Sequence, residues 1–253
     1  MLIINYLTKI PVLKRFVPSV IRRVCKVLKI EFFTIKYEQV YFRLKITDAV
    51  DRHILFRGEY ENLQIEYLFE SFHKHKIKTF IDIGSNIGVY SILLEKNAPD
   101  IKIFAFEPHP DAFLRLEYNL KLNNSKNISP HNVALSDKNK KGFLSIGENH
   151  KKNFKNFQSG GAQVNESGNI PISLAKGDDI LDYNNEFFGI KIDVEGHEKF
   201  VIYGMKNLLI NNKAFIQIEV HSKNFYEVDQ ILNDLGYNQI KKIGSHDYYY
   251  SNF

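Results

Sequence analysis

The feature that most limits the fold of this chain is a glycine-containing turn in the stretch FIDIGSNIGVYS, residues 80–91. The apolar run before Gly84 contains Asp82 and indicates a buried strand, and the residues after Gly88 indicate a helix. A turn between a first strand and a first helix brings a ligand close to the backbone and to the N–H groups at the start of the helix. The turn therefore predicts a ligand site at the carboxyl end of a parallel strand.

Strand and helix patterns alternate from residue 78 to the end of the chain. The order begins as a βαβαβ run, in which the strands KTFIDIG, KIFAFE and ISPHNVALS enclose the helices VYSILLEKN and DAFLRLEYNLKLN. A polar stretch near 147–170, flanked by the strand-like GFLSI and IPISLAK, interrupts the alternation, which then continues with FGIKIDVE, HEKFVIYGMKNLL, AFIQIEVH, NFYEVDQILNDLGY, NQIKKI and DYYYS. This order predicts an α/β fold with a parallel sheet and right-handed crossovers.

The N-terminal part has a different pattern. Aromatic and alternating apolar residues predict strands near 31–37, 40–46 and 53–57, and then a helix near 60–74. A chain of 253 residues, 44% of them apolar, is within the size range of one α/β domain. We therefore expect a basic N-terminal extension, residues 1–50, and one domain, residues 51–253.

Positive charge is concentrated at the N-terminus. Residues 1–30 contain seven Lys or Arg and no acid, and because the whole chain carries +5, residues 31–253 carry −2. In SVIRRVCKVLKI the cations lie largely on one side of the predicted helix. The opposite face is apolar and consists of Val20, Ile21, Val24, Val27 and Leu28. This helix could lie on an anionic membrane surface, or it could pack on its own domain with its charges in water.

Targeting signals are not evident. Apolar runs near the N-terminus are too short for a secretory signal or a membrane span. The single cysteine, Cys25, cannot form an intramolecular disulfide, which suits a reducing compartment. We expect a cytoplasmic protein, with residues 1–30 in peripheral contact with an anionic inner membrane face if the basic helix binds lipid.

The spacing of the turn selects among ligands. A dinucleotide-binding turn needs G-x-G-x-x-G, and Asn86 stands where the middle glycine would let a pyrophosphate approach. S-adenosylmethionine carries an amino acid and a nucleoside without phosphate, so Asp82 could orient its ammonium while Gly84 to Gly88 leave room for its methionyl part. Glu107, at the end of the next strand, could accept hydrogen bonds from both ribose hydroxyls.

Four blocks together resemble the FkbM-type methyltransferases, which have the class I S-adenosylmethionine-dependent fold: FIDIGSNIGVYS at 80–91, FEPHP at 106–110, NVALSD at 132–137 and IKIDVEGHE at 190–198. The resemblance covers about residues 78–220. It implies a Rossmann-like, seven-stranded, mostly parallel sheet with the last strand antiparallel, and usually O-methylation of sugars or natural products. It also implies a cofactor site, with Asp82, Gly84, Ser85, Asn86 and Gly88 at the methionyl part, Glu107 at the ribose, and Asn132, Val133 and Ala134 near the adenine.

Candidate catalytic groups follow the strands IKIDVE and IQIEVH, whose ends meet at one edge of the predicted sheet: Asp193, Glu195, His197, Glu198, Glu219 and His221. Methyl transfer needs an aligned acceptor and a group that removes its proton. We expect Asp193 at the methyl or methionyl region and His221 or Glu195 as the proton acceptor. Glu198 fits a helix cap better, His197 fits either role, and His73, His75 and His109 are interpreted as surface or packing residues.

Several alternatives remain open at this stage. The same acids and His221 could hold a divalent cation, although we prefer a metal-free mechanism. A nucleic-acid methyltransferase is disfavoured because the catalytic block reads Asp193-Val194-Glu195-Gly196 rather than Asn or Asp followed by two prolines and an aromatic residue. A non-catalytic module that binds a partner or membrane is a third possibility. Acceptor contacts are expected in the N-terminal strands and in the 147–170 stretch, which offers Ser159, Gly160, Gly161 and Gln163.

Overall fold

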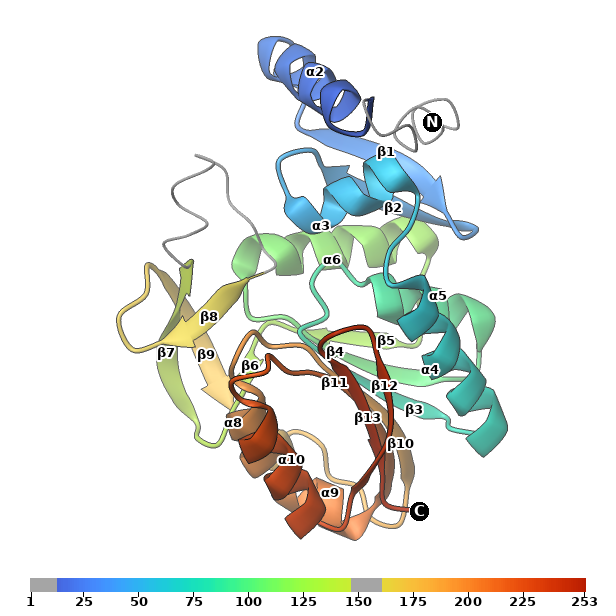
Figure 1. Cartoon of the computed structure of the whole chain (residues 1–253), viewed down its shortest axis with the longest axis vertical. Coiled ribbons are helices and arrows are strands. Elements are labelled where there is room, and N and C mark those ends of the chain that lie inside the picture. The colour runs from blue at the N-terminus through green and yellow to red at the C-terminus, as the bar shows by residue number, and fades with distance from the viewer. Residues whose placement is uncertain (1–12, 147–160) are drawn as a thin grey trace.

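The computed structural model describes residues 13–146 and 161–253, and its centre is a seven-stranded sheet (Figure 1). The strands, in spatial order, are β12 (Asn238–Ile243), β13 (Asp247–Ser251), β11 (Lys213–Glu219), β10 (Phe187–Ile192), β3 (Thr79–Ile83), β4 (Lys102–Phe106) and β5 (Ile128–His131). Strand β13 is antiparallel to both of its neighbours, while β11, β10, β3, β4 and β5 are mutually parallel. This arrangement confirms the predicted sheet with an antiparallel last strand.

Helices cover both faces of this sheet (Figure 1). One face carries α4 (Asn62–His75), α5 (Val89–Asn97) and α6 (Pro110–Asn123), and the other carries α8 (Glu198–Gly204), α9 (Lys206–Asn211) and α10 (Phe225–Asp234). Successive residues of a strand point to opposite faces, so Phe80 packs in the first hydrophobic cluster and Ile81 in the second. Because both faces are covered, the central strands are apolar throughout, as parallel strands usually are.

The helix predicted over HEKFVIYGMKNLL is broken into α8 and α9 at Gly204 and Met205. A Cβ atom at Gly204 would overlap the carbonyl oxygen of Ser136, so the break lies where this helix crosses the backbone of another segment. The prediction of one continuous helix was therefore wrong. Its apolar periodicity continues across the break, since Leu208 and Leu209 are buried beside Val201 and Ile202.

The N-terminal part forms a helix, α2 (Leu13–Val27), and an antiparallel hairpin of β1 (Phe32–Tyr37) and β2 (Val40–Lys45). The strand predicted at 53–57 is wrong, because this segment continues the short helix α3 (Ala49–Arg52) as a π-helical turn, η1 (His53–Arg57). Asp48 starts the helix by accepting the N–H groups of Val50 and Asp51, and Gly58 ends the turn at φ 66°. Ile54, Leu55 and Phe56 are all buried, and a short apolar run of this kind fits either a strand or a buried helix.

A buried ion cluster fastens the hairpin region to the sheet domain. Arg115 of α6 contacts Asp51 at 2.5 Å and Asp48 at 3.2 Å. On the same helix, Asn119 accepts the N–H of Arg43 and donates to the carbonyl of Ile87 in the glycine turn, at 2.8 and 3.0 Å. The hairpin, α6 and the turn are thus held together, and the hairpin shares one hydrophobic cluster with α4, α5 and α6.

A second, four-stranded sheet lies beside the end of β5. It consists of β6 (Ala134–Leu135), β9 (Ile170–Ala175), β7 (Lys140–Ile146) and β8 (Ala162–Asn165) in that order, and a 3-10 turn, η2 (Gly177–Asp179), follows it. The strand predicted over ISPHNVALS is therefore two strands in different sheets, separated at Asn132, whose side chain donates to the carbonyl groups of Glu107 and Pro108. Ser159 and Gly160 lie outside the described residues. Within the described ranges, no helix combines the length and apolar character that crossing a membrane requires.

Candidate active site

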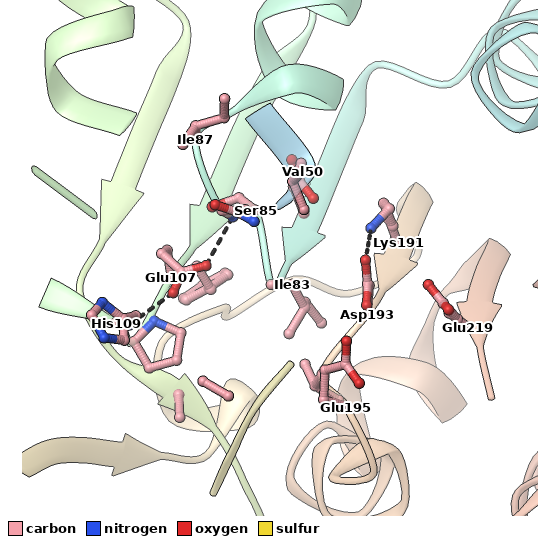
Figure 2. A pocket seen from close by; sticks show the side chains of 18 of the residues that line it. Val50, Ile83, Ser85, Ile87, Glu107, His109, Lys191, Asp193, Glu195 and Glu219 are labelled. Carbon is pink, nitrogen blue, oxygen red and sulfur yellow. Dashed lines mark hydrogen bonds and ion pairs between the residues drawn. The ribbon is translucent and has the colours of Figure 1, made fainter. Parts of the chain in front are cut away.

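A cavity of about 300 Å³ opens at the carboxyl ends of β3, β4, β10 and β11 (Figure 2). Most of the predicted site residues line it: Asp82, Gly84, Ser85, Asn86, Glu107, Val133, Ala134, Asp193 and Glu195. Gly88, Asn132 and His221 are not among its lining residues. The N-terminal part also contributes to the walls, through Ala49, Val50, His53, Tyr60 and Glu61, which the sequence patterns did not single out.

Positive φ angles shape the glycine turn. Gly84, Asn86 and Gly88 have φ values of 82°, 49° and 86°. A Cβ atom at Gly84 would overlap the backbone carbonyl oxygen of Asp193, and one at Gly88 would lie 2.5 Å from Cδ1 of Leu116. Gly84 is therefore required by the close approach of β3 to the end of β10, in addition to any room that it leaves for a ligand.

Glu107 connects the second strand to this turn. Its Oε2 accepts the N–H of Asn86 and its Oε1 accepts the N–H of His109, both at 2.8 Å (Figure 2). Burial raises the pKa of Glu107 to about 7, although these two N–H groups and Arg115 act in the opposite direction. Each carboxylate oxygen keeps a further lone pair, so Glu107 can still accept hydrogen bonds from a ligand in the cavity.

His109 is a buried packing residue rather than a surface residue. Its Nδ1 accepts the N–H of Asp111 at 3.1 Å and so caps the start of α6. Burial lowers the pKa of His109 to about 4. This histidine is therefore neutral at physiological pH, and its place beside Glu107 is structural.

Unpaired polar atoms lie around the other side of the turn. Asp82 is buried, and its Oδ2 accepts a hydrogen bond from Ser91 at 2.6 Å, whereas its Oδ1 has no hydrogen-bond partner among the described residues. The hydroxyl of Ser85 is likewise buried without a described partner. Buried polar atoms normally have partners, so an acceptor and a hydroxyl left open at a cavity fit a ligand that carries an ammonium and a carboxylate.

The opposite half of the cavity contains a buried ammonium, Lys191. Its Nζ contacts Oδ2 of Asp193 at 2.8 Å and lies 4.7 Å from the centroid of the Tyr90 ring (Figure 2). Burial alone would lower the pKa of Lys191, but Asp193, Glu61 and Asp82 raise it above its usual value. Sequence reasoning missed this residue, although a lysine inside the apolar strand FGIKIDVE is itself a signal of a buried charge.

Glu61 is a second group that sequence reasoning missed. It precedes α4 in a left-handed conformation with φ 45°, and its Oε2 accepts a hydrogen bond from the Tyr90 hydroxyl at 2.7 Å. Gln217 of β11 donates to the same hydroxyl at 3.1 Å. A non-glycine residue at positive φ is uncommon and is often found where the backbone directs a side chain into a functional site.

The remaining predicted groups lie at the rim. His221 Nε2 is 3.5 Å from Oε2 of Glu195, and the His221 side chain is 44% exposed. Glu198 is buried at the first residue of α8, and its Oε1 accepts the N–H of Gly196, which precedes the helix, at 2.6 Å. His197 stacks on Phe200 and lies 3.0 Å from the Ser136 hydroxyl, and burial lowers the pKa of His197 to about 4.

Metal ligation was an open alternative for these acids. Within residues 13–146 and 161–253, no group of three or more His, Cys, Asp or Glu side chains is arranged to hold a metal ion. Asp193 instead contacts the Lys191 ammonium, and Glu195 contacts the His221 ring.

Comparisons with known proteins agree with this geometry. Residues 82–238, more than half of the chain, match the family model for the methyltransferase FkbM domain. Hexuronic acid methyltransferase AglP of Haloferax volcanii is 31% identical over 143 residues, which are 56% of this chain and 55% of AglP. Methyltransferase 1 of Beauveria bassiana is 33% identical over 55 residues, or 22% of each chain. The matched stretch thus spans about half the length of AglP and less of the fungal protein.

Among solved structures, TYW2 of M. jannaschii in complex with AdoMet matches with a TM-score of 0.45 and 15% identity, and covers 87% of this chain and 84% of TYW2. The tRNA (uracil-54, C5)-methyltransferase of Pyrococcus abyssi, in complex with S-adenosyl-L-homocysteine, matches with a TM-score of 0.47 and 10% identity, and covers 87% of this chain and 44% of that one. The family match, the strand order and the glycine turn lead to one conclusion: the chain belongs to the FkbM methyltransferase family and has the Rossmann-like class I methyltransferase fold.

Proposed function

We propose that this protein is an S-adenosylmethionine-dependent O-methyltransferase that acts on a hydroxyl of a sugar, glycan or small hydroxylated molecule. S-adenosylmethionine supplies the methyl group, already activated by its bond to a positively charged sulfur. The observation that carries the proposal is a single cavity with two different halves, a glycine turn with Glu107 on one side and carboxylates beside Lys191 on the other. The sugar methyltransferase activity in the name of AglP supports the choice of acceptor class.

We assign the residues of the first half to the methyl donor. The open Oδ1 of Asp82 and hydroxyl of Ser85 suit its amino acid part, along with Gly84 and Asn86. Glu107 suits its ribose, and Val133 and Ala134 offer an apolar surface for its adenine. Two other predicted residues act indirectly: Gly88 shapes the turn, and Asn132 holds the carbonyl of Glu107.

In the second half, Asp193 is held by Lys191 and faces the region between the two halves (Figure 2). Glu195 and His221, expected from the sequence as alternative proton acceptors, form a pair at the rim, where they can also orient an acceptor. The division at residue 50 into an extension and a methyltransferase domain stays a prediction. Contacts of Asp48 with Arg115 and of Arg43 with Asn119 support a close association between the two parts.

The first experiment is titration calorimetry with S-adenosylmethionine and with NAD. We expect binding of S-adenosylmethionine and no binding of NAD at millimolar concentration, because Asn86 occupies the position that a pyrophosphate would need. A transfer assay with a tritiated methyl donor over sugars, lipid-linked glycans and small hydroxylated metabolites then identifies the acceptor class. Binding of NAD, or absence of S-adenosylmethionine binding by the folded protein, would contradict the proposal.

Two other functions are distinguishable from this one. A nucleic-acid methyltransferase would need to admit phosphates near Glu61, Asp193 and Glu219, which like charges oppose. An RNA gel-shift assay at increasing salt and methyl transfer to RNA test that alternative. A non-catalytic binding module would bind no methyl donor, so the calorimetry already separates it from an enzyme.

We also propose peripheral contact with an anionic membrane through α2, which would place the enzyme in the cytoplasm at the inner membrane face. Ile21 and Cys25 of α2 pack on the protein, but a neighbouring stripe of the helix is exposed: Phe16, Val20, Val24 and Val27. Val27 is 81% exposed, and Arg23 and Lys26 lie next to the stripe on the helical wheel. An exposed apolar stripe with flanking cations suits the interface of an anionic bilayer.

A vesicle sedimentation assay tests this contact. The full chain should bind vesicles that contain anionic lipid, bind less at high salt, and not bind neutral vesicles. A double variant, Val24→Ser with Val27→Ser, should bind at least about tenfold more weakly, because two exposed side chains lose burial worth about 1.5 kcal/mol each. The control is Leu114→Ser, which changes an equally exposed apolar residue on α6. Equal binding by both variants would contradict the contact.

A further inference from the structure

Three carboxylates from separate parts of the chain meet in the second half of the cavity. Glu61 comes from the residue before α4, Asp193 follows β10, and Glu219 ends β11. We call these three residues the acid cluster. Lys191 contributes one ammonium to the same region, so the cluster has an excess of negative charge when its members are ionised (Figure 2).

The carboxylates of this region differ in what they contact. Asp193 is held by Lys191 at 2.8 Å, and Glu61 accepts the Tyr90 hydroxyl at 2.7 Å. Neighbouring acids are engaged too: Glu195 pairs with His221 at 3.5 Å, and Asp247 accepts a hydrogen bond from Gln64 at 2.9 Å. By contrast, no hydrogen bond or ion pair with another described residue engages the carboxylate of Glu219.

Glu219 is therefore positioned to react rather than to support a neighbour. It is half-buried, lines the cavity (Figure 2), and lies on β11 in register with Asp247 of β13. A general base must reach the proton that it removes and must have a lone pair available for it. Asp82 also has an open oxygen, but we assign it to the methyl donor; of the other described carboxylates around Lys191, Glu219 meets both conditions without the loss of an existing contact.

We propose that Glu219 takes the proton of the acceptor hydroxyl, and that entry of the cationic methyl donor into the cavity converts Glu219 from the protonated to the ionised form. This inference rests on the proposed function. The O–H bond of the acceptor breaks and its proton passes to a carboxylate oxygen of Glu219. The oxygen electron pair forms the new C–O bond to the methyl carbon, while the C–S pair stays with sulfur. The proton then leaves from Glu219 to water.

The charges around Glu219 explain the conversion. Burial, followed by repulsion from Asp193, raises the pKa of Glu219 to about 8, with Asp247 and Glu61 acting in the same direction and Lys191 opposing them. The protonated form of this side chain is therefore favoured before the methyl donor binds. A positive charge in the cavity favours the ionised form, so binding of a sulfonium lowers the pKa and releases the proton before the acceptor reacts.

Proton release on binding is the direct test. Calorimetric titration of wild-type protein with S-adenosylmethionine at pH 7.5, in buffers of different ionisation enthalpy, measures the number of protons released. If the pKa of Glu219 falls from about 8 to about 7, its release is about 0.5 proton per site. Glu219→Gln should release about 0.5 proton fewer than the wild type, and ionisation of the ligand itself cancels in that difference.

Two controls and one conservative variant accompany the measurement of proton release. S-adenosylhomocysteine lacks the sulfonium charge, so its binding should show little dependence on Glu219. Glu227→Gln removes a surface carboxylate that pairs with Lys199, and should release as many protons as the wild type. Glu219→Asp keeps the carboxylate and should restore part of the release.

If Glu219→Gln does not fold, the wild type alone still tests the inference. A fall of one pKa unit predicts that affinity for S-adenosylmethionine, relative to S-adenosylhomocysteine, rises about sevenfold from pH 6.5 to pH 9.

With any acceptor that the wild type methylates, Glu219→Gln should lose at least about 100-fold in kcat, with Glu219→Asp retaining more.

The outcomes separate this inference from the proposed function. Failure of the folded wild type to bind S-adenosylmethionine would overturn both. Binding with equal proton release by the wild type and Glu219→Gln, or with no change of relative affinity with pH, would overturn only the coupling of Glu219 to the cofactor. Unchanged kcat in Glu219→Gln would overturn its role as the proton acceptor.

Discussion

Substitution of Gly84 by alanine tests the geometry of the glycine turn in the most direct way. An alanine at φ 82° has a conformational cost of about 1–2 kcal/mol. Its Cβ would also overlap the carbonyl oxygen of Asp193, a backbone atom that no side-chain rotation can move away. Relief requires β3 and β10 to separate where Asp193 donates to the carbonyl of Ile83 at 3.0 Å.

These contributions can be added for an estimate. Overpacking of this kind costs about 1–3 kcal/mol, and a weakened backbone hydrogen bond costs about 0.5–1.5 kcal/mol. Together with the conformational cost, Gly84→Ala should lower the free energy of unfolding by about 3–6 kcal/mol. Because Asp193 lies at the same contact, any variant that folds should also bind S-adenosylmethionine more weakly.

Two other glycines provide matched controls. Gly236 has a similar φ of 86° with nothing within 4 Å of a Cβ atom, so Gly236→Ala should show the conformational cost alone, about 1–2 kcal/mol. Gly88→Ala should fall between the two, because the nearby atom belongs to the flexible side chain of Leu116. Urea unfolding followed by circular dichroism gives the three values. Equal losses for Gly84→Ala and Gly236→Ala would refute the packing argument.

Three further predictions concern charged groups. Glu107→Gln should weaken S-adenosylmethionine binding about 10- to 100-fold in calorimetry, because a charge-assisted contact to the ribose is lost. The fold raises the pKa of Glu219 from 4.5 to about 8, so protonation of Glu219 stabilises the folded state at low pH, and this stabilisation is lost as pH rises through that interval. The glutamine of Glu219→Gln does not titrate, so the Tm of this variant relative to wild type should increase from pH 5 to pH 9. Arg115→Met leaves Asp48 and Asp51 without their cation and should destabilise the protein by about 3–5 kcal/mol in urea unfolding, with Arg115→Lys less affected.

The parts of the fold that sequence predicted well depend on local chemistry. The turn at Gly84 and Gly88, the acid at Glu107 and the alternating strands and helices around them each have a pattern that few other structures produce. Parallel strands joined by right-handed crossovers have their carboxyl ends at one edge of the sheet, so the ends of β3, β4, β10 and β11 meet there.

The errors arose where contacts distant in sequence decide the outcome. The apolar run of η1 has no periodicity that separates a buried strand from a buried helix, and the helix α3 that it continues is held by contacts of Asp48 and Asp51 with Arg115, more than sixty residues later in the chain. The helix breaks beside Gly204, which lies against the backbone of Ser136, nearly seventy residues earlier in the chain. A single sequence without the fold does not show such crossings.

The same reason explains why two charged residues of the cavity were missed. Lys191 and Glu61 influence each other only because β10 and the segment before α4 meet at the cavity. Lys191 lies inside the block IKIDVEGHE but was given no role there, and Glu61 belongs to none of the four blocks. Glu61 also precedes the region 82–238 that matches the family. The residues that we propose for the methyl donor thus lie within the shared region, whereas Glu61 of the acid cluster comes from the segment before it. We therefore expect the acceptor of this protein to follow from the charges of its own acid cluster, which favour an acceptor without a carboxylate near the reacting hydroxyl, rather than from the hexuronic acid in the name of AglP.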